Sequence, residues 1–94
     1  MAYVLTQFSV EDFTQWKVVF DSFVPIRRNY SSRGARAFRM PGDMHKVVVL
    51  TEFADLDRAV ALYASQDFKD AIQRAGVIGT EQVTLLEEID RLPA

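Results

Sequence analysis

The chain has 94 residues, of which 49% are hydrophobic and 26% are charged, and its formal net charge is −2. We expect residues 1–94 to form a single domain, because this length leaves no room for a second core. The slight acidic excess argues against a nucleic-acid partner, the lack of cysteine excludes disulfides, and a single histidine cannot supply the paired ligands of a metal site.

The first half of the chain opens with residues 3–8, which alternate and are rich in strand-forming side chains, so they predict a β-strand. A helix is predicted next, because acidic residues that suit a helix N-terminus precede an amphipathic pattern. Its four rings fall within about 80° of one another on a helical wheel: Phe13, Trp16, Phe20 and Phe23. Pro25 predicts a kink or a restart before the element ends near Ser31.

The second half of the chain begins with residues 34–40 and 46–54, which flank a turn containing Pro, Gly and Asp and therefore predict a β-hairpin. Apolar residues then recur at helical spacing over residues 56–64 and 66–76, which predicts two helices in succession. A last strand is predicted over residues 81–89. The order βαββαβ indicates an α+β fold of the ferredoxin-like type, with a four-stranded antiparallel sheet and helices on one face.

Both faces of the predicted sheet are apolar. Val47 and Val49 point to one face of their strand, while Val48 and Leu50 point to the other. The helices can cover only one of these faces, and a large apolar face left in water is unfavourable. We therefore expect a homodimer that packs sheet against sheet.

Several short motifs occur in an order found in a known group of proteins: Trp16-Lys17 ahead of Phe20-Asp21, Glu52-Phe53 at a strand end, and Ala75-Gly76-Val77 before the last strand. Over nearly its whole length the chain resembles the antibiotic biosynthesis monooxygenase-like (ABM) superfamily, especially its short bacterial members described as cyclases or without an assigned activity. The resemblance implies a dimeric α+β barrel with one cavity per subunit between helices and sheet. It also implies activities such as cofactor-independent oxygenation of aromatic polyketides, haem degradation or cyclisation.

The chain departs from that superfamily at two places. The hairpin turn, acidic and ending in Pro-Asn in many relatives, reads PGDMHK here, so a role of that turn is not carried over. The haem-degrading relatives use a histidine on the second helix with a nearby asparagine and tryptophan, whereas here the sole histidine is in the hairpin turn and the sole tryptophan is on the first helix. We therefore set haem aside and expect no cofactor.

The aromatic face of the first helix has two compatible interpretations. Rings at this spacing form ordinary core, because each buries an area worth about 2 to 3 kcal/mol. Alternatively, Trp16 and Phe20 line a cavity that binds a planar hydrophobic molecule. Tyr63, on the apolar face of the next helix, is expected in the core with its hydroxyl at a cavity edge or at the subunit seam.

Two residues are candidates for acid–base catalysis. His45 is the only side chain whose unperturbed pKa lies near neutrality, although a histidine in a tight turn is usually exposed. Glu52 would face Arg36 if the hairpin register makes them cross-strand neighbours, and the pair would then orient a ligand or shift the proton affinity of the carboxylate. The alternative is an ion pair at the sheet edge worth about 0 to 1 kcal/mol.

Five arginines form one local basic patch: Arg27, Arg28, Arg33, Arg36 and Arg39. Their spread over a helix end, a loop and a strand is typical of a solvated rim. The segment RGARAF resembles an RNA-binding signature only superficially, because alanines stand where stacking aromatics are needed and the segment lies on the wrong strand. We therefore expect no nucleic-acid partner.

Two functions fit these patterns. The first is a cofactor-independent monooxygenase or cyclase that holds a hydrophobic, aromatic or polyketide-like molecule against Trp16 and Phe20, with the substrate supplying the reactive carbanion. The alternative is a non-catalytic ligand-binding or interaction protein, because the sequence contains no recognisable catalytic constellation. We expect a cytoplasmic location and no membrane partner, since no apolar run approaches the roughly 18 residues of a spanning helix and no signal pattern is seen.

Overall fold

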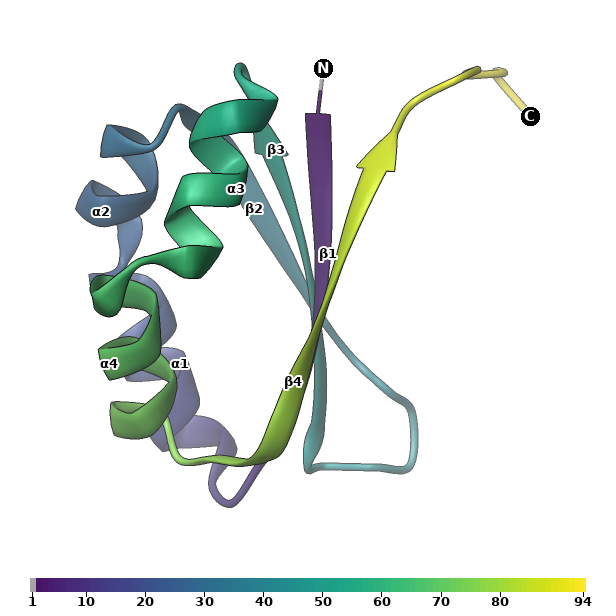
Figure 1. The fold of residues 1–94 in the computed structure, drawn as a ribbon. Coiled ribbons are helices and arrows are strands. Elements are labelled where there is room, and N and C mark those ends of the chain that lie inside the picture. The colour runs from purple at the N-terminus through teal and green to yellow at the C-terminus, as the bar shows by residue number, and fades with distance from the viewer. Residues whose placement is uncertain (1) are drawn as a thin grey trace.

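The computed structural model describes residues 2–94 and contains one four-stranded antiparallel sheet with helices on one of its faces (Figure 1). The strands are β1 (Ala2–Val10), β2 (Ser32–Arg39), β3 (Lys46–Phe53) and β4 (Val77–Glu87), and the helices are α1 (Phe13–Ser22), α2 (Val24–Asn29), α3 (Leu56–Ala64) and α4 (Gln66–Arg74). The strand order is β2-β3-β1-β4, so the predicted ferredoxin-like α+β fold is confirmed. Among residues 2–94, each helix is too short or too polar to span a lipid bilayer.

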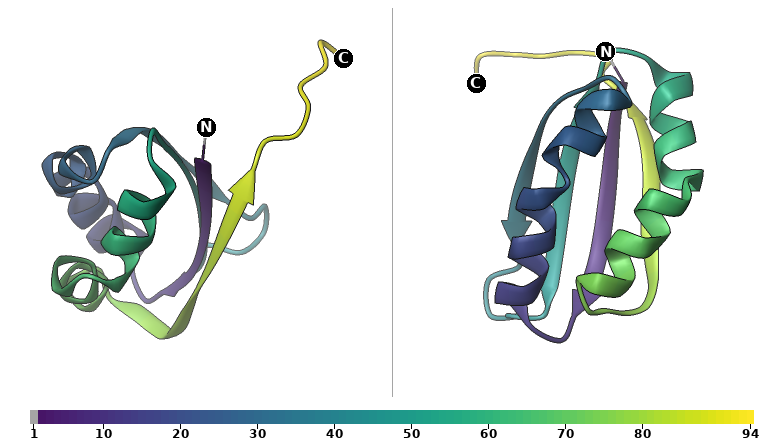
Figure 2. Two further views of the ribbon diagram at one scale, coloured as in Figure 1. Left: turned by 45° about the horizontal axis from the view of Figure 1, so that its top comes forward. Right: turned by 90° about the vertical axis from the view of Figure 1, so that its left-hand side faces the viewer.

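The helices form two columns, α1 with α2 and α3 with α4, which lie side by side across the sheet (Figure 2). Side chains cap three of the helices: Asp12 accepts from the Thr14 amide at 2.9 Å, and Asp55 and Ser65 begin α3 and α4 in the same way. The break predicted at Pro25 is a full restart. Pro25 lies in the first turn of α2, where its missing N–H leaves no hydrogen bond unmade.

The two faces of the sheet follow the predicted alternation. On the face under the helices, Val4 and Val47 are almost fully buried, together with every second residue along β1 and β3. The other face, here called the open face, carries Tyr3, Leu5 and Leu50, which are only half-buried in the single chain. The apolar surface predicted to need a partner is therefore present on the open face.

The ends of β4 and the register of the hairpin differ from expectation. The strand begins at Val77 rather than near residue 81, because Gly79 adopts a positive φ of 70° and an irregularity in the β1–β4 register absorbs the residues that look like a turn. In the β2–β3 hairpin, Arg36 lies opposite Leu50, and Glu52 lies opposite Gly34. Arg36 and Glu52 share the open face but are not direct cross-strand neighbours.

Candidate functional site

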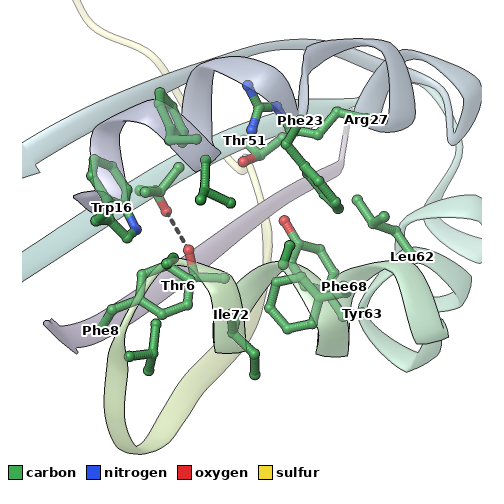
Figure 3. A pocket seen from close by; sticks show the side chains of 16 residues that line it. Thr6, Phe8, Trp16, Phe23, Arg27, Thr51, Leu62, Tyr63, Phe68 and Ile72 are labelled. Atoms are coloured by element: carbon green, nitrogen blue, oxygen red, sulfur yellow. Dashed lines mark hydrogen bonds between the residues drawn. The ribbon is translucent and has the colours of Figure 1, made fainter. Parts of the chain in front are cut away.

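A cavity of about 60 Å³ lies between the two helical columns and the sheet (Figure 3). Helices α1, α2, α3 and α4 and strands β1, β3 and β4 all contribute to its walls. Most of the lining is apolar, and the polar side chains are Thr6, Arg27, Thr51 and Tyr63. A mostly apolar lining with a few polar groups is the usual composition of a small-molecule site.

The aromatic stripe of α1 forms one wall of this cavity. Trp16 is only 3% exposed and stacks on Phe20, with ring centroids 4.8 Å apart and planes inclined by 16°. Phe13 lies next to Trp16 at 5.8 Å but does not line the cavity, whereas the buried Phe23 does. The stripe is therefore both core and cavity wall, because the rings that pack on one another also bound the empty space.

Arg27 brings a positive charge to the edge of the cavity. Its guanidinium carbon lies 4.5 Å from the centroid of the Phe20 ring and 5.8 Å from that of Phe23, which are cation–π distances. Burial lowers the pKa of Arg27, while the nearby Asp21 and Tyr63 act in the opposite direction. A guanidinium stays protonated near neutral pH even so, and Arg27 therefore places a charge beside the aromatic wall.

Tyr63 enters from α3 and is held by two edge-to-face contacts, with Phe53 at 6.0 Å and Phe68 at 4.9 Å. Burial raises the pKa of Tyr63, an effect that the facing hydroxyl of Thr51 and the charge of Arg27 partly offset. The phenol is therefore a neutral hydrogen-bond donor at physiological pH. Figure 3 shows Arg27, Thr51 and Tyr63 around one end of the cavity and Trp16 at the other.

Thr6 supplies the remaining polar group of the cavity. Its hydroxyl donates to the carbonyl oxygen of Val49 at 3.5 Å, across the β1–β3 pair. Thr6 and Thr51 are almost fully buried on the helix-covered face, at positions where the alternation of the strands calls for apolar side chains. Their hydroxyls make the floor of the cavity locally polar.

The structure places three of the predicted ligand-binding residues, Trp16, Phe20 and Tyr63, around this one cavity. Arg27 was assigned only to the basic patch. It lies four residues after Phe23 and seven after Phe20, so it continues the same helical stripe, but the restart at Pro25 hides this periodicity. The sequence could also have marked Thr51 as a site residue, because it is a polar residue at a strand position whose neighbours in the alternation are buried and apolar.

The other predicted site residues lie outside the cavity. His45 is exposed in the β2–β3 turn, where its Nδ1 lies 2.9 Å from the carbonyl oxygen of Val10 and donates to it, tying the turn to the end of β1. Glu52 and Arg36 line a depression of about 850 Å³ on the open face, together with Tyr3 and Arg91. Within residues 2–94 no ion pair joins Arg36 to Glu52, because the hairpin register sets them two positions apart.

The part of the chain that the structure describes holds no cluster of three His, Cys, Asp or Glu side chains arranged to bind a metal ion. The cavity lining itself has Arg27 as its only charged member. Its chemistry therefore consists of one cation, three hydroxyls and aromatic surface.

A comparison with protein-family models matches residues 1–89 to the model described as Domain of unknown function (DUF1330). No curated protein sequence matches the chain significantly. The match therefore covers nearly the whole chain and carries no activity with it.

Solved structures show the same fold at low sequence identity. SnoaB, a cofactor-independent oxygenase from Streptomyces nogalater, superposes with a TM-score of 0.80 at 14% identity, covering 99% of this chain and 97% of its own. An antibiotic biosynthesis monooxygenase gives 0.69 at 17% identity, covering 96% and 100%. A conserved protein from Methanosarcina mazei gives 0.73 at 11% identity, covering 93% and 91%. The ABM-like fold expected from the motifs is thus confirmed.

Proposed function

This chain belongs to the DUF1330 family, and we propose that it works as a homodimer that binds a hydrophobic aromatic molecule in the cavity between its helices and its sheet. One observation carries the proposal: the stacked pair Trp16 and Phe20 borders empty space that also receives Arg27 and the Tyr63 hydroxyl. A core built only for stability would fill that space, because voids cost packing energy and buried polar groups cost desolvation. Aromatic walls with a few polar groups suit a planar ligand.

The reaction that fits this cavity is cofactor-independent oxygenation, or a cyclisation through a related carbanion. In such chemistry the substrate supplies the electrons, and the protein must stabilise a developing oxyanion away from water. Arg27 offers positive charge and Tyr63 a neutral O–H donor at one end of the cavity. The shared fold of SnoaB, a cofactor-independent oxygenase, supports this choice, although a fold hosts many functions.

A second candidate is binding without turnover. It is favoured by the positions of His45 and Glu52, which lie outside the cavity and cannot reach a ligand held against Trp16. The lining supplies no carboxylate or imidazole within residues 2–94. An enzyme would then need a substrate acidic enough to ionise beside Arg27, or a base from the second subunit.

The proposed dimer uses the open face of the sheet. Phe38 on β2 is 50% exposed and Leu86 on β4 is 40% exposed, and they flank the half-buried Leu5 and Leu50 on the same face. An exposed apolar patch of this kind marks an interaction surface, and a second copy would bury it together with the polar residues that share the face. We place the dimer in the cytoplasm, as the sequence predicts.

Intrinsic fluorescence offers a direct test, because Trp16 is the only tryptophan and borders the cavity. Titration with naphthol, a neutral aromatic probe, is expected to change Trp16 emission with saturation. The matched control is Val18→Ala on the exposed side of α1, which should leave the titration unchanged. Oxygen uptake with anthrone, an aromatic ketone with an acidic C–H, then separates the two candidates. Saturable binding without oxygen uptake would favour the non-catalytic role, and no saturable change would overturn the proposal.

A further inference from the structure

Arg27 separates two spaces, and this position bears on what the cavity binds. On its inner side is the cavity of about 60 Å³, which is itself partly open to the surface. On its outer side is a surface groove of about 260 Å³ that Arg27 and Phe20 also line, with Arg28 and Arg33 further along it. The stacked Phe20 and Arg27 thus form the partition between an apolar interior and a basic exterior.

Arg27 has no ion-pair partner in residues 2–94, and Asp21 acts on its charge only from a distance. The one acidic residue of the outer groove, Asp21, is engaged by Lys17, whose Nζ lies 2.7 Å from both of its carboxylate oxygens. Among residues 2–94, no carboxylate forms an ion pair with Arg27 and no acceptor takes a hydrogen bond from its side chain. Its guanidinium carbon lies 4.5 Å from the centroid of the Phe20 ring, so the main contact of the group is with an aromatic face, which takes up none of its N–H donors in a conventional hydrogen bond.

A guanidinium that has no ion pair and donates no hydrogen bond within the protein can bind the carboxylate of a ligand. Its planar fork matches the two oxygens of a carboxylate, and such a pair gains strength where water is partly excluded. Arg28 and Arg33 add positive charge on the outer side, which favours the approach of an anion. Trp16 and the apolar lining on the inner side favour the opposite end of the same molecule.

Resting on the proposed function, we infer that the ligand is an aromatic carboxylate, with its ring against Trp16 and its carboxylate on Arg27. The cavity volume of about 60 Å³ is smaller than the roughly 150 Å³ cavity that accepts benzene in a well-packed core. A ring therefore enters by displacing Phe20, which is only half-buried, and so joins the cavity to the groove. That movement leaves Arg27 beside the carboxylate at the junction.

The experiment compares naphthoate with naphthamide, which share a ring system and nearly the same shape but differ in charge. Both are titrated at neutral pH against the full chain, with Trp16 fluorescence and calorimetry as readouts. The variant Arg27→Met removes the charge and keeps an apolar stem, and Arg27→Lys keeps the charge without the fork. The matched control is Arg39→Met, because Arg39 stacks on Phe13 at 4.6 Å in the same manner but does not line the cavity.

We expect wild type and Arg39→Met to bind naphthoate about tenfold or more tightly than naphthamide, a difference of about 1.4 kcal/mol. Arg27→Met should weaken the binding of naphthoate more than that of naphthamide and so lose this preference, and Arg27→Lys should fall between. Equal affinities for the two probes in wild type would overturn this inference and leave the aromatic cavity standing, as would a preference that survives in Arg27→Met. If neither probe bound, the proposed function would fall, and this inference with it.

Discussion

The two faces of the sheet carry similar apolar side chains and have opposite surroundings. Val4 and Val47 face the helices and are almost fully buried, whereas Leu5 and Leu50, paired across β1 and β3, face away from them and stay half-buried. The difference comes from the chain connections, because both crossovers of this topology are right-handed and return their helices to one side. One face is covered within the chain and borders a cavity, while the other stays half-exposed in the single chain and is the face of the proposed subunit contact.

The largest effect is expected on the helix-covered face. Trp16→Ala should lower the free energy of unfolding by about 3 to 5 kcal/mol, because a buried ring stacked on Phe20 is replaced by a cavity. Val18→Ala on the same helix, at a site 64% exposed, should stay within about 0.5 kcal/mol of wild type. Urea unfolding followed by circular dichroism measures both. Similar losses for the two variants would show that the stripe does not hold the helix to the sheet.

A second prediction concerns the open face. Leu50→Arg places a charge in the centre of the proposed subunit contact and should raise the dimer dissociation constant about a hundredfold, or about 2.7 kcal/mol. The reason is the cost of desolvating an unpaired charge. Val60→Arg makes the same change on the outer side of α3, where the residue is 47% exposed, and should leave the mass unchanged. Sedimentation equilibrium decides, and a wild type that stays monomeric at micromolar concentration would contradict the dimer itself.

The smallest expected effect is a pH dependence from Tyr63. Because burial raises the pKa of this phenol, its neutral form stabilises the folded state below the ordinary tyrosine value of about 10, and this contribution is lost as the pH rises through the raised value. Between pH 9 and pH 12, wild type should therefore lose unfolding free energy faster than Tyr63→Phe. If the unfolding free energies of wild type and Tyr63→Phe changed with pH in parallel, the result would contradict the burial of the Tyr63 hydroxyl.

Much of the fold was predictable, because it depends on local patterns. Apolar spacing over residues 56–64 and 66–76 predicted the two helices that the structure shows as α3 and α4, and the alternation along the strands predicted two apolar faces. The beginning of β4 was not predictable, because Gly79 and its neighbours read as a turn until pairing with β1 accommodates them as an irregularity. Periodicity predicts which side chains of one strand share a face, but it does not predict the register in which two strands pair.

The candidate site was predictable only in part, and Arg36 shows why. Whether it meets Glu52, and on which face, depends on a hairpin register that the residues 40–45 of the turn do not reveal. His45 was chosen for its intrinsic pKa, but its place is decided by a hydrogen bond to Val10 on a strand 35 positions away. A prediction of site residues from side-chain chemistry alone does not include how far apart those residues lie in the folded chain.

The sequence by itself determined the order of elements, the aromatic stripe of α1 and the excess of apolar surface, because these follow from spacing along one chain. Only the tertiary structure decided that Arg27 joins the stripe, that Tyr63 and Thr51 meet it across the cavity, and that Arg36 and Glu52 belong to the open face. Those contacts join segments that are distant in the chain. They depend on how helices and strands are set against one another, which local periodicity does not encode.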